Sequence, residues 1–280
     1  MKEALRSFKL AAWLGWQIES NWTDPFLFGI YSIAKPVSAA LILVVMYSVV
    51  AQGGPGNPLF PFMYLGNAFY IYVGSLLIGI SWAIIADREE YGPLKYIYTA
   101  PLRLMWYLIG RGMARLMIGT ISVIITLLIG ALFLSVPIHF ASIDWLLLAA
   151  AMALGLIGLM AGGLLLAGMS FLMARHSGYI GEATAGALYL FTGSIFPLSV
   201  LPAALQPIGY ILPITYWLEA IRRSMMGTSA ASTFSGWSDT QVIVALAVSS
   251  LAWGILAVLY FRFAENRARQ RGLIDWQTQY

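Results

Sequence analysis

The sequence predicts an all-α integral membrane protein with six membrane-spanning helices. Its 280 residues are 60% hydrophobic and only 10% charged, whereas a soluble domain carries roughly 25% charged residues. The apolar residues form stretches long enough to cross a bilayer, and short polar or Gly/Pro-rich segments separate them. A six-span arrangement also gathers most Lys and Arg residues on one side, which the positive-inside rule makes the cytoplasmic side.

Several classes of function are disfavoured by the residue types present. Cysteine is absent, which excludes a disulfide framework, an iron–sulfur cluster and a thiolate zinc site. His139 and His176 lie in separate predicted loops without an HExxH pattern, so we expect no metal site. Ser194 lies in TGSIF, which lacks the G-x-S-x-G pattern of a nucleophile elbow, so we expect no catalytic residue. The net charge of +4 does not suggest a nucleic-acid partner.

Residues 1–25 are predicted to form an amphipathic helix in the membrane interface, with a disordered tail as the alternative. Four residues can share an apolar face: Leu5, Phe8, Ala12 and Trp16. Three basic residues lie on the polar side: Lys2, Arg6 and Lys9. A basic amphipathic segment with tryptophan is typical of a helix that lies in the headgroup plane.

Residues 26–265 are expected to form one transmembrane domain. Its predicted spans are about Phe28–Val50, Phe62–Ala86, Trp106–Val136, Trp145–Met173, Ala183–Phe196 and Val242–Phe261. Gly158 and Gly162 form a GxxxG pattern on the fourth span, where small residues allow close helix packing. Both termini are then cytoplasmic, residues 266–280 form a basic cytoplasmic tail, and Arg222 and Arg223 fall on the outer side.

A polar segment, DREEYGPLKYIYTAP at residues 87–101, separates the second and third spans. Pro93 can begin a helix because the first helical position needs no N–H donor. Leu94, Ile97 and Tyr98 follow at i, i+3 and i+4 and therefore share a face. We expect a short amphipathic helix that lies across the bundle and provides a docking surface. The alternative is an ordinary inter-helix loop.

The stretch from Pro197 to Ser224 is apolar but broken by prolines. Two short helices, about Ala203–Leu212 and Ile214–Ser224, fit it better than one span. Irregular backbone at membrane depth is tolerated only where protein buries it or where it lines a cavity. We therefore predict a re-entrant helical hairpin at the outer mouth of the bundle. Glu219 and Arg222, three residues apart on its second helix, can pair.

Together these features resemble the permease subunit of a type-2 ABC transporter. That family has six spans and an amphipathic N-terminal helix. It also has a Glu-rich, Gly-containing segment after the second span that ends in a Thr/Ser-x-Pro-like element, matched here by residues 88–92 and 99–101. A late signature is matched by Phe196, Pro197, Leu201, Pro202, Pro213, Tyr216, Glu219 and Arg222. The chain departs from the family at Pro93 and Lys95, where Thr and an acid are common.

The resemblance implies a pump made of two permease copies, expected to be a homodimer, and two copies of a separate ATPase that binds ATP and Mg. This chain would bind no cofactor, and it has no Gly-Lys dipeptide and therefore no P-loop. The residues implied to couple to the ATPase are Arg88, Glu89, Glu90, Gly92, Leu94, Ile97 and Tyr98. The residues implied to form the outer gate are Phe196, Pro197, Pro202, Pro213, Glu219 and Arg222.

The implied function is ATP-driven export of an amphiphilic, lipid-like or drug-like substrate across the cell membrane. The alternative is an ion-coupled secondary carrier or channel without an ATPase, but such proteins need ionisable or unwound sites near mid-membrane, and the predicted spans hold almost no acid in their middles. A third possibility, an intramembrane enzyme, lacks a candidate catalytic pair. Glu182 either caps the fifth span or lines a substrate entrance.

Overall fold

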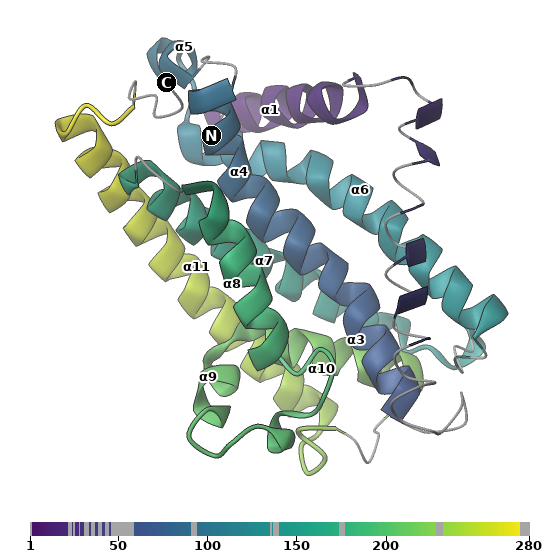
Figure 1. The fold of residues 1–280 in the computed structure, drawn as a ribbon. Helices are drawn as coiled ribbons and strands as arrows, with labels where there is room; N and C mark the ends of the chain where they lie inside the picture. Colours follow the sequence, from purple (N-terminus) through teal and green to yellow (C-terminus); the bar gives the residue numbers. More distant parts are fainter. Residues whose placement is uncertain are drawn as a thin grey trace.

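The computed structural model describes residues 2–21, 59–90, 94–134, 136, 140–173, 177–227 and 232–274, with scattered positions between residues 24 and 45. Within these residues the secondary structure is helical, with no strand. Four of the described helices are long and apolar enough to cross a membrane, which confirms the predicted all-helical class. The long helices run side by side, and short helices lie at both ends of the bundle (Figure 1).

The central helix of the bundle runs from Leu59 to Glu90 without a break. Its consecutive parts are α3 (Leu59–Val73), η1 (Gly74–Ile78), α4 (Gly79–Ile85) and η2 (Ala86–Glu90), of which η1 and η2 have π-helical turns. Two-thirds of its apolar stretch is buried (67%), against 22–39% in the other three long helices. The predicted second span therefore lies at the centre of the bundle.

The other long helices overlap the predicted third, fourth and sixth spans: α6 (Leu104–Phe133), α7 (Trp145–Leu172) and α11 (Asp239–Gln270). The predicted first span, Phe28–Val50, falls mostly outside the described residues. The predicted fifth span overlaps α8 (Ser177–Phe191), which has 15 residues. At 1.5 Å per residue it extends about 22 Å, which is shorter than a hydrocarbon core of about 30 Å. The six-span layout thus stays a prediction.

α7 packs against both the central helix and α11, and glycines allow the close approach. A Cβ atom on Gly163 would lie 2.8 Å from Ile80 Cδ1 on α4. A Cβ atom on Gly158, which belongs to the GxxxG pattern, would lie 2.8 Å from Ser250 Oγ on α11. Because real Cβ atoms do not approach so closely, larger residues at these positions would push the helices apart.

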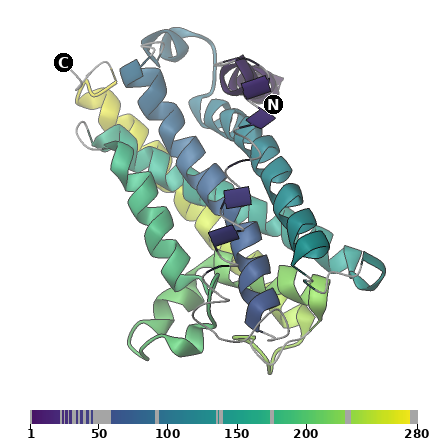
Figure 2. The same cartoon turned by 45° about the vertical axis from the view of Figure 1, so that its right-hand side comes forward.

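The helix α1 (Lys2–Asn21) lies across one end of the bundle and packs against α6 (Figures 1 and 2). Its buried stripe consists of small residues: Ala4, Ser7, Ala11 and Gly15. The approach is close, since a Cβ atom on Gly110 would lie 2.5 Å from the carbonyl oxygen of Phe8. The predicted apolar face lies beside this stripe and includes the exposed Leu5, so that face stays available to lipid.

Short helices close the two ends of the bundle. The end that carries α1 also carries α5 (Leu94–Thr99) and the C-terminal end of α11 (Figures 1 and 2). The opposite end carries α9 (Gln206–Ile211) and α10 (Pro213–Met226), and the remaining short elements are η3 (Phe140–Ser142) and η4 (Leu198–Val200). Every residue of α10 from Pro213 to Met225 is buried. The second helix of the predicted hairpin is therefore enclosed by protein.

Candidate coupling site, outer gate and cavity

The polar segment at residues 87–101 begins at Asp87, which forms a buried cluster with two residues of α6. Arg111 Nη1 on α6 donates to Asp87 Oδ1 at 3.1 Å and to the Tyr107 hydroxyl at 3.1 Å. The Tyr107 hydroxyl in turn donates to Asp87 Oδ2 at 2.8 Å. All three side chains are buried. This cluster fixes η2 to the first turns of α6.

Arg88 and Glu89 form a second buried contact, which joins η2 to α7. Arg88 Nε donates to Glu89 Oε1 at 2.9 Å. The guanidinium also donates to the carbonyl oxygens of Ser170 at 3.2 Å and Met173 at 3.4 Å. Ser170 lies in the last turn of α7 and Met173 is the residue at its C-terminal cap, where the helix itself supplies no N–H donors. Arg88 therefore caps α7, and both predicted coupling residues lie inside the bundle.

The short helix α5 is held to the end of α11. The Tyr98 hydroxyl donates to Glu265 Oε1 at 2.8 Å, and Arg269 Nε donates to the same hydroxyl. The Arg269 guanidinium lies over the Tyr98 ring at 4.6 Å. Burial raises the pKa of Tyr98 to about 12, against the opposing effect of the Arg269 hydrogen bond. The hydroxyl therefore stays protonated and able to donate at neutral pH.

The predicted apolar face of α5 packs against the core of the same chain and does not face outward. Leu94 is buried in a core cluster, and Ile97 and Tyr98 pack against the same cluster. The outward side presents Tyr96 and Thr99, and Tyr96 is 67% exposed. Of the other predicted coupling residues, the side chain of Glu90 and the whole of Gly92 lie outside the described residues.

At the opposite end, Arg222 of α10 holds three segments together. Its Nε donates to the carbonyl oxygen of Phe62 at 3.0 Å, and Nη2 donates to those of Gly193 at 2.8 Å and Ser194 at 2.9 Å. The guanidinium also lies over the Phe62 ring at 3.6 Å. This side chain therefore joins α10, the start of α3 and the turn that follows α8.

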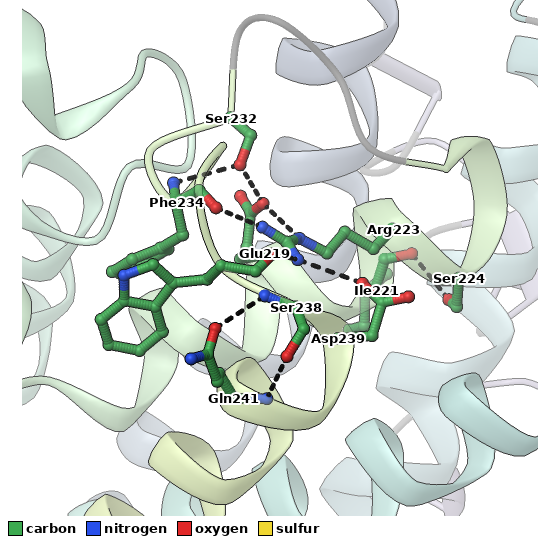
Figure 3. A network of polar contacts seen from close by, with 10 residues as sticks. Glu219, Ile221, Arg223, Ser224, Ser232, Phe234, Ser238, Asp239 and Gln241 are labelled. Atoms are coloured by element: carbon green, nitrogen blue, oxygen red, sulfur yellow. Dashed lines mark hydrogen bonds and ion pairs between the residues drawn. The ribbon is translucent and has the colours of Figure 1, made fainter.

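Glu219 pairs with Arg223 and not with Arg222, which corrects the predicted pair (Figure 3). Arg223 Nε donates to Glu219 Oε1 at 2.8 Å, and the two side chains are buried. Arg223 also donates to the carbonyls of Phe234 at 2.5 Å and Trp237 at 2.7 Å. It contacts Asp239 Oδ1 at 3.1 Å. Because the partners are four residues apart on one helix, their side chains meet on one face.

The other predicted gate residues shape the backbone at this end. Pro213 occupies the first position of α10, which needs no N–H donor. Pro197 precedes η4, whose first amide, that of Leu198, donates to Thr233 Oγ1 at 3.2 Å. Phe196 is half-buried and Pro202 is exposed. The structure thus brings Pro213, Glu219 and Arg222 into α10 and leaves Pro202 on the surface.

A cavity of about 540 Å³ lies between the central helix, α6 and α8. Its polar lining is contributed by Asn67, Tyr70, Ser75, Arg115, Ser122 and Glu182. One wall is fixed by tyrosines, since the Tyr70 hydroxyl donates to the carbonyl of Ala185 at 2.5 Å and the Tyr189 hydroxyl to Asn67 Oδ1 at 2.6 Å. The cavity therefore combines an apolar helix surface with charged and amide groups.

The sequence model of one protein family, described as ABC-2 type transporter, matches residues 8–226. The chain belongs to this family. It is accordingly a multi-pass membrane protein and a transport permease, not a catalytic subunit, and permeases of this family typically pair with an ATPase subunit. No curated protein sequence matches the chain as a relative.

Several polar contacts of this ABC-2 permease escaped the sequence analysis. The cluster of Asp87, Tyr107 and Arg111 was missed, although Tyr107 and Arg111 are four residues apart at the start of a helix and thus share a face. The ion pair of Arg115 Nη2 with Glu19 Oε1 on α1, at 2.7 Å, was also missed. No local pattern indicates that pair, because the partners lie on different helices.

Proposed function

We propose that this chain is the membrane-spanning permease of an ATP-driven exporter and that two copies of a separate ATPase bind the end that carries α5. ATP and Mg would bind that partner. The observation that carries the proposal is the attachment of α5. It projects outside the long helices, its inward side is fixed to α11 through Tyr98, and its outward side presents Tyr96.

The polar contacts of α5 and η2 give a route for force from the ATPase to the spans. Movement of α5 acts on α11 through Glu265 and Arg269. Movement of η2 acts on α6 through Asp87 and on α7 through Arg88. Breaking the buried pair of Asp87 and Arg111 costs about 3–5 kcal/mol, so this contact can transmit displacement without separating. Leu94, Arg88 and Glu89 thus act as anchors of the coupling element.

The cavity between the central helix, α6 and α8 supports an amphiphilic cargo. Its volume of about 540 Å³ lies within the range of about 300–1,000 Å³ that is usual for small-molecule sites. Apolar side chains such as Ile71, Ile78 and Ile118 can contact a lipid-like or drug-like body, while Arg115 and Glu182 suit a polar group. A second copy of the chain, as a homodimer, completes the proposed pump.

The test is co-purification followed by transport. The chain is expressed with the ATPase encoded beside it and purified through a tag on the chain; a one-to-one complex is expected. Tyr96→Asp should disrupt this complex. Val200→Asp is the matched control, because Val200 is also 67% exposed but lies in η4 at the opposite end. In proteoliposomes, transport should require ATP. Transport that survives without ATP and collapses with the ion gradient would replace the proposal with the ion-coupled carrier.

A further inference from the structure

A second, smaller cavity of about 290 Å³ lies at the end of the bundle that carries α5. It is lined by α5, by the start of α6 with the residues just before it, and by the last turns of α11. The lining residues that matter here are Trp106, Arg103, Phe261, Arg262, Glu265 and Arg269. The transport function proposed above makes no use of this cavity.

The cavity carries a net positive charge, and its carboxylate does not pair with every arginine that lines it. It has three arginines and one carboxylate, and that carboxylate, Glu265, is engaged by Arg269 at 2.9 Å and by Tyr98 at 2.8 Å. Arg103 Nη2 is 3.8 Å from Glu3, and both of these side chains are largely exposed (58% and 72%). Arg262 makes no hydrogen bond or ion pair with any residue that the structure describes. Two guanidinium groups therefore have donors to spare.

The cavity lies where the apolar surface of the bundle ends, which is the depth at which a lipid headgroup would lie. Arg262 directly follows the apolar part of α11, and Leu251, Ile255 and Leu259 form an exposed apolar stripe that leads toward it along the same helix face. Exposed Trp106 lies on the facing start of α6, and tryptophan is enriched at the boundary between hydrocarbon and headgroups. A lipid whose headgroup fills the cavity can lay its acyl chains along this stripe, which a soluble anion cannot do.

We propose that this cavity binds the phosphate of an anionic membrane lipid. Arg103 and Arg262 donate to the phosphate oxygens, since the planar guanidinium matches that geometry. Trp106, which is exposed, contacts the glycerol and the first methylenes. Basic pockets between membrane helices are suited to such headgroups. Because Tyr98 and Arg269 line the same cavity, the bound lipid also holds α5 against α11.

The test measures lipid binding to the purified permease alone, so its outcome is separate from that of the ATPase experiment. The chain is placed in nanodiscs or mild detergent, and bound phosphatidylglycerol and phosphatidylcholine are counted by native mass spectrometry. We expect selective retention of phosphatidylglycerol. Arg262→Gln should weaken its binding about tenfold, or about 1.4 kcal/mol, and adding Arg103→Gln should weaken it further. The matched control is Arg267→Gln, an exposed arginine of the same helix that does not line the cavity.

Three results would overturn the proposal. Phosphatidylglycerol bound equally well by Arg262→Gln and by the double variant shows that these arginines are not its ligands. Equal weakening by Arg267→Gln shows attraction to general positive charge. Displacement of the lipid by soluble glycerol phosphate at similar concentration shows a site for a free phosphate. The single variant Arg262→Gln keeps the test valid if the double variant does not fold, because Arg262 is exposed and its loss removes no hydrogen bond or ion pair with a described residue.

Discussion

Tyr98→Phe removes one hydroxyl from the attachment of α5 and leaves the aromatic ring in place. The hydroxyl donates to Glu265 at 2.8 Å and accepts from Arg269. A hydrogen bond to a charged group contributes about 1.5–3 kcal/mol. The Arg269 side chain is 54% exposed, however, so solvent screening reduces the contribution of the hydrogen bond that it donates. We therefore expect the free energy that holds α5 in place to fall by about 1–2 kcal/mol, a factor of about 5–30 in the opening equilibrium.

Amide hydrogen exchange measures this opening directly. A helix of six residues is unstable by itself in water, so loss of the attachment should expose its amides. In Tyr98→Phe, the amides of residues 94–99 should exchange about 5–30-fold faster, while those in the middle of α7 should not change. The control is Tyr179→Phe, because Tyr179 is 71% exposed on α8. Unchanged exchange at residues 94–99 would refute the reasoning.

Two further predictions concern the other buried or half-buried charges. Arg222→Met leaves three buried carbonyl oxygens without their donor. A buried acceptor left unsatisfied costs about 1–3 kcal/mol, so the free energy of unfolding should fall by at least that amount, seen as a large fall in Tm that the exposed Arg267→Met does not show. Burial raises the pKa of Glu19 above its usual 4.5, although Arg115 opposes this. Because the pKa of Glu19 is higher in the folded protein than in the unfolded chain, protonation of Glu19 favours the folded state. This contribution to the stability of α1 is complete below pH 4.5 and is lost as the pH rises through the pKa that Glu19 has in the folded protein. Glu19→Gln should remove this pH dependence of Tm. If Tm varies with pH in the same way in Glu19→Gln and in the unaltered protein, Glu19 is not the group responsible.

The sequence predicts the short helix after the central span and the face that its apolar residues share. Leu94, Ile97 and Tyr98 do lie on one side of α5. The sequence does not predict whether this apolar face of α5 contacts the chain itself or a partner, because a periodic pattern shows that a face is buried without showing what buries it. In the structure the chain's own α11 and core cluster bury it.

The end of the bundle that carries α10 shows which contacts a sequence cannot predict. Arg222 and Arg223 are the exceptions to the predicted positive-inside pattern, and the contacts that hold them are visible only in three dimensions. The carbonyl of Phe62 that accepts from Arg222 lies 160 residues away along the chain. The helix that overlaps the predicted fifth span begins before Ala183, at Ser177, although SGYIGEA at residues 177–183 resembles a polar loop in the sequence. The helix includes these residues and ends before Gly193, whose φ of +70° suits glycine.

The most direct test of the coupling proposal uses the absence of cysteine from the chain. A single cysteine introduced as Tyr96→Cys carries a short photo-activated cross-linker, and Val200→Cys carries the same reagent at the opposite end. Each is co-expressed with the ATPase and illuminated. If the ATPase docks on α5, the cross-linked product should form at position 96 and not at position 200. A product at position 200 alone, or none at position 96 in an intact complex, would contradict the account.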